Sequence, residues 1–168
     1  MKQIETVSFD TKEKLYKYMN IKLVGLIGDE PDWLANLANA SALIWLMIED
    51  INWAGFYLMK NGKLVLGPFQ GKPACINIEL GKGVCGTAAQ DRETQLVKDV
   101  HDFPGHIACD SASQSEVVVP IIVDGEVIGV LDIDSPDINR FDEEDRAGFE
   151  RIVGTLVKYV AWESVKNR

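Results

Sequence analysis

Three cysteines lie where a thiol could do chemistry. Cys109 lies in a long polar loop, between Phe103 and Glu116, that has no hydrophobic periodicity. A structural cysteine behaves as a small hydrophobic residue of the core, whereas a cysteine in a polar loop is more often placed for reaction. Cys75 and Cys85 lie upstream. One nucleophilic thiol with one or two resolving thiols is what a thiol-based redox cycle requires.

A second reactive group is acidic. Asp132 and Asp134 are two residues apart in an expected strand, so their side chains point to the same face. Two carboxylates this close repel each other, so a cation binds between them or one of them holds a proton. The alternative for this pair is a solvated strand end.

Glu116 lies on the same face as these aspartates only in one register of the hairpin that residues 116–134 are expected to form. If residues 123–125 form a three-residue loop with a glycine bulge, residue 122 pairs with 126 and Glu116 falls opposite Asp132. A two-residue loop would instead turn Glu116 to the other face. The sequence Val-Asp-Gly favours the bulged loop, and we therefore expect an acidic triad.

Two other patterns in the sequence, a glycine-rich motif and a set of possible zinc ligands, do not predict a site. Residues 81–86, Gly-Lys-Gly-Val-Cys-Gly, match the dinucleotide fingerprint G-x-G-x-x-G. That fingerprint belongs to parallel strands joined by helical crossovers, whereas hairpins are expected on both sides of it here. Zinc could be held by the three cysteines with His101 and His106. The cysteines are ten and 24 residues apart and lack a close C-x-x-C pair, so we expect no metal site.

The elements that must position these residues follow from periodicity and end signals. Asp10 is expected to cap the first helix, with Glu13 completing a capping box and Leu15, Tyr18, Met19, Leu23 and Leu26 in its apolar stripe. Expected helices are Thr11–Ile27, Asp32–Met47, Val84–Asp91 and Asp142–Ser164. Expected strands are Trp53–Met59, Lys63–Leu66, Ala74–Glu79, Thr94–Val97, Glu116–Val123 and Glu126–Asp134, with the first hairpin turning over residues 60–62. Helices at both ends of antiparallel hairpins predict an α+β fold.

Length and composition bound the rest. The 168 residues predict one domain, over 1–168, with room for a sizeable core. The first ten residues contain no apolar run and no stretch is long enough for a membrane helix, so we expect a cytoplasmic protein that does not associate with membranes. A net charge of −9 argues against nucleic acid as a partner. Trp33, Trp45 and Trp162 are expected in the core, and Trp53 in the core or in a pocket wall.

Several segments together resemble the free methionine-(R)-sulfoxide reductases, which are single GAF-domain enzymes. They are residues 52–57 (Asn-Trp-Ala-Gly-Phe-Tyr), 66–75 (Leu-Gly-Pro-Phe-Gln-Gly-Lys-Pro-Ala-Cys), 81–86, 103–110 (Phe-Pro-Gly-His-Ile-Ala-Cys-Asp), 115–120 (Ser-Glu-Val-Val-Val-Pro) and 129–135 (Gly-Val-Leu-Asp-Ile-Asp-Ser). The resemblance covers most of the chain and includes all three cysteines. It is specific within the wider GAF superfamily, most of whose members lack this cysteine set.

The resemblance implies a central antiparallel sheet with the terminal helices on one side and the site on the other. It implies that Cys109 is the nucleophile, that Cys75 resolves it through a disulfide, and that Cys85 is auxiliary. The positions that line the substrate pocket in the family are Glu116, Asp132 and Asp134, with Trp53 near the substrate methyl group. It also implies the R epimer as substrate, thioredoxin as reductant, no metal or organic cofactor, and a homodimer.

Two other classes of function remain as alternatives. A GAF domain can act as a ligand sensor, but a sensor needs an output domain or a partner, for which 168 residues leave no room. A redox switch would oxidise its cysteines without turnover. Turnover of free methionine sulfoxide separates the three readings.

Overall fold

A computed structural model of the chain describes residues 8–107 and 109–166. Its helices are α1 (Lys12–Ile27), α2 (Trp33–Met47), α3 (Gly83–Asp91), α4 (Glu143–Tyr159) and α5 (Trp162–Lys166), with a 3-10 turn at Val100–Asp102. Its strands are β1 (Trp53–Lys60), β2 (Lys63–Gly71), β3 (Asn77–Glu79), β4 (Gln95–Val97), β5 (Ser115–Val123) and β6 (Glu126–Ser135). Most of these elements are the predicted ones, but β2 runs five residues beyond the predicted Leu66, to Gly71, and α5 is separate from the predicted closing helix.

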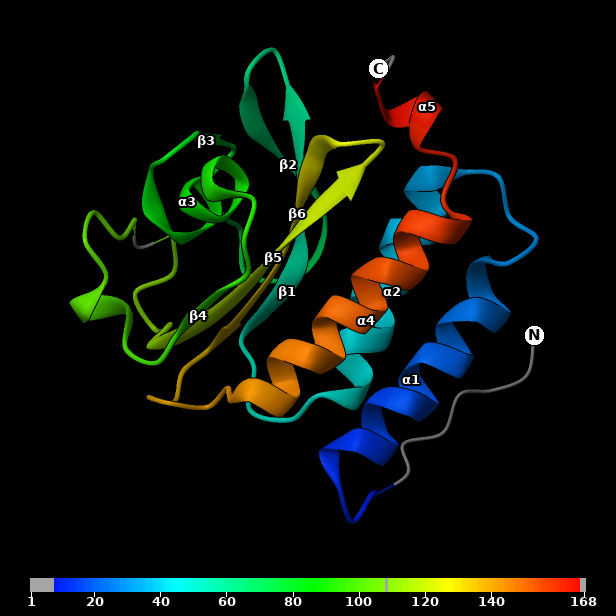
Figure 1. Cartoon of the computed structure of the whole chain (residues 1–168). Coiled ribbons are helices and arrows are strands. Elements are labelled where there is room, and N and C mark those ends of the chain that lie inside the picture. The colour runs from blue at the N-terminus through cyan, green and yellow to red at the C-terminus, as the bar shows by residue number, and fades with distance from the viewer. Residues whose placement is uncertain (1–7, 108, 167–168) are drawn as a thin grey trace.

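The strands form one six-stranded sheet in the order β3-β2-β1-β6-β5-β4, and each pairing between described strands is antiparallel. Helices α1, α2 and α4 lie together on one face of the sheet, whereas α3 lies on the other face (Figure 1). The predicted α+β class is confirmed, and the dinucleotide-binding alternative is excluded because it requires parallel strands.

Alternation along the central strands separates two cores. Phe56, Val117 and Leu131 face the helical layer, where they join the larger cluster of buried hydrophobic side chains. Tyr57 and Val118 point the other way, into a smaller cluster with α3. Because successive side chains of a strand point to opposite faces, the same strands build the hydrocarbon core on one side and the pocket on the other.

The β5–β6 hairpin corrects the predicted register. Its loop has two residues, Asp124 and Gly125, both at positive φ as in a type I′ turn, and Val123 pairs with Glu126. Such a loop alone would have turned Glu116 to the helical face. A bulge at Ile128, which lies between the partners of residues 121 and 122, shifts the register by one residue. Glu116 therefore lies on the same face as Asp132 and Asp134, as predicted, but because of this bulge and not because of a three-residue loop.

Helix ends differ from prediction in two places. The α1 N-cap is Thr11, whose Oγ1 accepts from the Lys14 N–H at 3.3 Å, and Asp10 instead forms an ion pair with Lys14. The closing helix ends at Tyr159. The chain then turns so that the buried Trp162 donates its indole N–H to the Leu156 carbonyl at 3.0 Å. Breaking the helix there buries an aromatic ring that a continuous helix would have placed elsewhere.

Other predicted positions are also corrected. The strand expected over Ala74–Glu79 is reduced to β3, so Cys75 lies in the preceding loop. In α1 the buried positions include Tyr16 and Ile27, while Leu15, Tyr18 and Leu26 only pack at the edge of the core. Trp162 is buried and Trp33 partly buried, but Trp45 is 41% exposed. Helix α2 is apolar on both faces. Only one of these faces can lie against the sheet, so Trp45 is left on the outer one.

A charged cluster joins the first and last long helices. Asp145 is 2% exposed and accepts hydrogen bonds from the Tyr16 hydroxyl at 2.8 Å and from Lys12 Nζ at 2.5 Å. Asp145 also closes a capping box with Asp142 at the start of α4. Asp142 accepts from Lys12 at 2.7 Å. Helices α1 and α4 are therefore fixed to each other in register.

Within the described chain no helix is long and apolar enough to cross a membrane.

Two glycines of α4 provide a matched test of this packing. A Cβ added at Gly148 would lie 2.3–2.4 Å from atoms of the Tyr16 ring, whereas one added at Gly154 would meet nothing within 4 Å. We expect Gly148→Ala to lower the free energy of unfolding by about 1–3 kcal/mol through overpacking. Gly154→Ala should raise it by about 0.5–1 kcal/mol through helix propensity. Urea unfolding followed by circular dichroism measures both, and changes of the same sign would contradict the α1–α4 packing described.

Candidate active site

Cys75 and Cys109 are joined by a disulfide, with their Cα atoms 5.5 Å apart. Cys75 comes from the loop between β2 and β3, and Cys109 from the loop between the 3-10 turn and β5. The pairing agrees with the one that the family resemblance implied. Of the three cysteines in the sequence, Cys85 is the one that remains a free thiol.

Asp110 anchors the loop that carries Cys109. Its carboxylate accepts from the backbone N–H of Ala112 at 2.9 Å and from Asn52 Nδ2 at 3.2 Å, and it pairs with Lys72 at 3.3 Å. The hydrogen bond from Ala112, with help from Lys72, lowers the pKa of Asp110. This ionised residue ties the Cys109 loop to the start of β1 and to the segment leading to Cys75.

Aromatic side chains of β1 line the pocket, and one of them is hydrogen-bonded to the backbone of Cys75. Tyr57 donates its hydroxyl hydrogen to the Cys75 carbonyl at 3.0 Å, and burial raises the pKa of Tyr57 so that it stays neutral. Trp53 is 2% exposed and stacks between Tyr57 and Phe69, with ring centroids 5.7 and 5.2 Å away. Trp53 also lines the pocket, so both roles foreseen for it are realised in one residue.

The three acids predicted as a group line this same pocket. Glu116 pairs with Asp134 across the hairpin, and Asp132 lies two residues before Asp134 on the same face. Glu116 and Asp132 are each 6% exposed. Opposite Asp132 on β1 lies Gly55, where a Cβ would collide with Phe69 and with the indole of Trp53.

Burial decides how these acids ionise. It raises the pKa of Asp132 to about 7, and it also raises the pKa of Glu116 and of Asp134, each of which is further raised by the Asp132 charge. Carboxylates taken out of water repel one another, so three of them share a pocket only with a proton or a cation. The raised pKa values therefore favour at least one protonated carboxyl group in this pocket at neutral pH.

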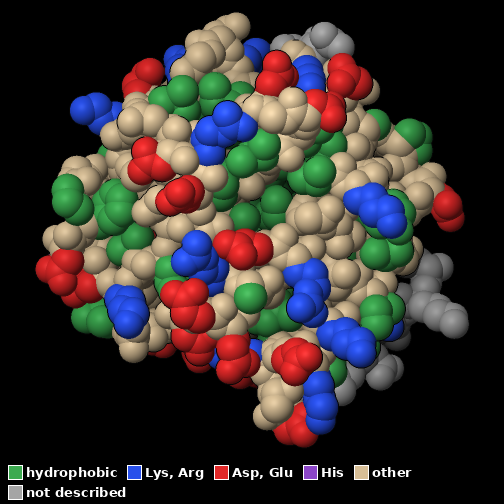
Figure 2. All heavy atoms as spheres, viewed as in Figure 1, with side chains coloured by type: hydrophobic (Ala, Val, Ile, Leu, Met, Phe, Trp, Pro, Cys, Tyr) green, Lys and Arg blue, Asp and Glu red, His purple; other side chains and the backbone are tan. Residues whose placement is uncertain are grey.

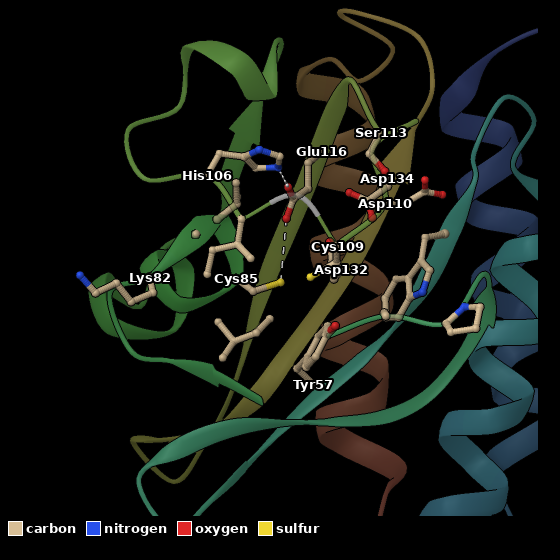
Figure 3. A pocket seen from close by; sticks show the side chains of 17 residues that line it. Tyr57, Lys82, Cys85, His106, Cys109, Asp110, Ser113, Glu116, Asp132 and Asp134 are labelled. Carbon is tan, nitrogen blue, oxygen red and sulfur yellow. Dashed lines mark hydrogen bonds and ion pairs between the residues drawn. The ribbon is translucent and has the colours of Figure 1, made fainter. Parts of the chain in front are cut away.

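Cys85 lies at the floor of the pocket, on α3, and is 4% exposed. Its thiol donates to Glu116 Oε1 at 3.9 Å (Figure 3). Burial, and then the charge of Asp132, raise the pKa of this thiol. Nearby Gly86 explains the glycine-rich motif, because a Cβ there would lie 2.3 Å from the Glu79 carbonyl oxygen. Gly86 thus allows α3 to lie close to the end of β3.

Sequence reasoning missed the site role of His106, which it considered only as a zinc ligand. Its Nε2 lies 3.9 Å from Glu116 Oε2, and its ring is 17% exposed. Burial lowers the pKa of His106. Its position three residues before Cys109 was the available signal. The zinc set considered from sequence is not assembled: two of its cysteines share a disulfide, and His101 is exposed and paired with Asp99.

The pocket has about 530 Å³ of empty space, part of it open to solvent. It combines an aromatic wall, three acids and a thiol at its floor with Cys109, which is held in the disulfide. Such a pocket suits a small ligand with a cationic end and an apolar end, next to a pair of cysteines that can exchange two electrons. On the face shown in Figure 2, acidic and basic side chains are interspersed, without a broad basic patch for nucleic acid.

Comparisons with known proteins give a consistent result. The GAF-domain profile matches residues 39–158. Protein YtsP of Bacillus subtilis (strain 168) is 53% identical over 96% of this chain and 99% of its own length. The free methionine-R-sulfoxide reductase of Escherichia coli (strain K12) is 50% identical over 93% of this chain and 94% of its own. The X-ray structure of free methionine-R-sulfoxide reductase from Neisseria meningitidis in complex with its substrate superposes with a TM-score of 0.91. It is 40% identical and the match covers 99% of both chains.

The raised pKa of Asp132 predicts a pH-dependent stability. Its pKa is about 7 in the folded protein but about 3.9 in an unfolded chain, so between these values the folded state holds a proton that the unfolded state has released. The stability it contributes is present below about pH 4 and falls as pH rises to about 7. Asp132→Asn should therefore stabilise the oxidised protein at pH 8, by at most about 4 kcal/mol, and much less at pH 4.5.

Thermal unfolding at the two pH values measures this difference. Asp29→Asn, which changes an exposed carboxylate, is the control and should shift Tm little at either pH. An Asp132→Asn protein whose stability relative to wild type does not depend on pH would show that Asp132 is not the buried titrating group.

Proposed function

The chain belongs to the family of GAF-domain free methionine-R-sulfoxide reductases, and we propose that it reduces free L-methionine-(R)-sulfoxide to L-methionine. The observation that carries this proposal is the Cys75–Cys109 disulfide, whose Cys109 lines the same pocket as Glu116, Asp132 and Asp134. A disulfide is the product that remains after a thiol enzyme has reduced a sulfoxide. The acids supply a partner for the ammonium that distinguishes free methionine from a residue in a peptide.

The cycle starts from the reduced enzyme. The Cys109 thiolate attacks the sulfoxide sulfur, whose oxygen is protonated as the sulfur becomes electrophilic. The S–O bond of the substrate breaks, its protonated oxygen passes to the Cys109 sulfur to give a sulfenic acid, and the substrate sulfur, reduced by two electrons, leaves as methionine. Cys75 then attacks this sulfur, releasing water and closing the disulfide. Cys85, which is buried and outside the disulfide, is the auxiliary thiol of the family pattern.

The acids take two roles in this scheme. One of Glu116 and Asp132 holds a proton near neutral pH and donates it to the sulfoxide oxygen. The remaining carboxylates, including Asp134, bind the substrate ammonium. Trp53 lies against the methyl end of the substrate. The substrate carboxylate lies against the 111–115 loop, whose Ser113 lines the pocket.

Recycling needs an external dithiol. We propose thioredoxin, whose potential near −270 mV allows it to reduce disulfides of this kind. Each step uses side chains and this reductant, and we propose that no metal or organic cofactor takes part. A cycle that returns to free thiols suits the cytoplasm, which keeps thiols reduced.

A homodimer is also proposed, on the apolar outer face of α2. Leu34 is 52% exposed, Trp45 41% and Leu46 44%. Exposed aromatic and aliphatic side chains on one helix face are typical of a protein–protein interface. Helix α2 lies on the face of the sheet opposite α3 (Figure 1), and α3 contributes Cys85 to the pocket, so the pairing would leave the site accessible.

Thioredoxin-coupled consumption of NADPH tests the function and separates it from a sensor or a redox switch. Wild type should turn over free methionine-(R)-sulfoxide and fail with the N-acetylated form, which has no ammonium for the acids to bind. Asp134→Asn should lose about ten- to a hundredfold in kcat/KM, as expected for one charge-assisted hydrogen bond. Equal turnover of the N-acetylated substrate would refute the acidic clamp, and no turnover at all would favour the sensor or switch.

Single-turnover experiments separate the roles of the cysteines. Cys109→Ser should release no methionine, because the nucleophile is gone. Cys75→Ser should release about one methionine per enzyme and then stop, because the sulfenic acid cannot be resolved through the observed disulfide. Methionine release is measured by chromatography after mixing reduced enzyme with substrate. If Cys109→Ser still gives one turnover, the nucleophile is assigned to the wrong residue.

A further inference from the structure

The floor of the pocket brings together three groups that can bind a metal ion. Cys85 Sγ, a carboxylate oxygen of Glu116 and one of Asp132 all lie within 4.8 Å of one another. They come from three elements, α3, β5 and β6, and all three residues are buried. The sulfur-to-Glu116 distance is 3.9 Å, and Figure 3 shows the thiol directed at this carboxylate.

A second feature of this cluster is a buried carboxylate oxygen without a hydrogen-bond partner in the described part of the chain. Asp132 Oδ1 is buried and has no hydrogen-bond partner among the residues that the structure describes. Asp132 as a whole is 6% exposed, and its side chain faces the pocket. A buried carboxylate oxygen without a partner is costly and indicates a site for a cationic ligand.

We propose that Cys85, Glu116 and Asp132 bind one thiophilic divalent cation of the Zn²⁺ class in the oxidised protein. Zinc holds sulfur at about 2.3 Å and oxygen at about 2.0–2.2 Å, so its tetrahedral ligands lie roughly 3.3–3.7 Å apart. The cluster reaches this spacing if its atoms approach one another by about an ångström. The fourth position faces the open pocket and is taken by water.

The ligand types decide which cation fits. A thiolate favours Zn²⁺ or Cd²⁺ over the hard cations Mg²⁺ and Ca²⁺, which require more oxygen ligands than this floor offers. Three anionic ligands around a dication also remove the repulsion between Glu116 and Asp132. A cation bound there would occupy the carboxylates assigned to the substrate, so it competes with substrate and takes no part in turnover.

The oxidised protein allows this site to be studied alone. With Cys75 and Cys109 in the disulfide, Cys85 is the remaining thiol, so thiolate ligation of an added metal can come from it and no other cysteine. The proposal therefore does not depend on the reductase activity. A failure in metal binding leaves the turnover experiments untouched.

The test is a titration of oxidised wild type with Cd²⁺ and with Zn²⁺. Cd²⁺ should produce the ultraviolet thiolate-to-cadmium absorption, saturating at one ion per chain, and calorimetry should give the same stoichiometry for Zn²⁺. Cys85→Ser, which keeps the size and hydrogen-bonding ability of the side chain, should abolish the absorption and weaken Zn²⁺ binding at least about tenfold. Glu116→Gln should weaken it by a similar factor.

His101→Ala is the matched control, because His101 and Asp99 form an exposed pair that could bind zinc at the surface. This variant should bind as wild type does. The thiolate absorption is read on wild type itself, so it decides the matter even if a variant fails to fold. Its absence from wild type, or equal zinc affinity in Cys85→Ser, would overturn the proposal. Loss of binding in His101→Ala would place the ion at the surface instead.

Discussion

The structure depends on one electrostatic constraint: three carboxyl groups and a thiol share one buried face of the sheet. Burial raises the pKa of all three carboxyl groups, and the charge of Asp132 raises those of Glu116 and Asp134 further. Such a cluster is stable only if it keeps a proton or binds a cation. Both responses are useful to a sulfoxide reductase, which needs an acid for the leaving oxygen and a partner for the substrate ammonium. The same constraint makes the floor of the pocket attractive to a thiophilic metal ion.

The remainder of the fold makes this arrangement possible. The opposite face of the same strands packs against α1, α2 and α4 in a continuous hydrocarbon core, which holds the sheet rigid behind the acids. On the site face, Asp110 fixes the Cys109 loop, and Tyr57 fixes the backbone of Cys75. The two cysteines thus come from loops, one held by Asn52 at the start of β1 through Asp110 and the other by Tyr57 on β1. This keeps the sulfur atoms within reach of each other and of the pocket.

Much of the site could be predicted from the sequence because its signals are local. A cysteine in a polar loop, two aspartates in alternation on a strand, and the hairpin signals at residues 60–62 and 123–125 each depend on neighbours in the chain. The face of Glu116 could not be derived this way. Val127 and Ile128 are both apolar, so nothing local shows that Ile128 is the extra residue of a bulge. The prediction reached the right face by assuming a different loop.

The sequence by itself determined the α+β class, most of the elements, the reactive cysteines and the acidic pair. Tertiary structure decided which thiols meet, that Cys85 lies beneath Glu116, and that Asp110, Tyr57 and His106 belong to the site. It also decided that Trp45 faces outward while Trp162 turns inward. Periodicity and turn chemistry follow from local sterics and can be read along the chain. Distances between residues of separate elements, and the desolvation that shifts their pKa values, exist only after the elements have packed.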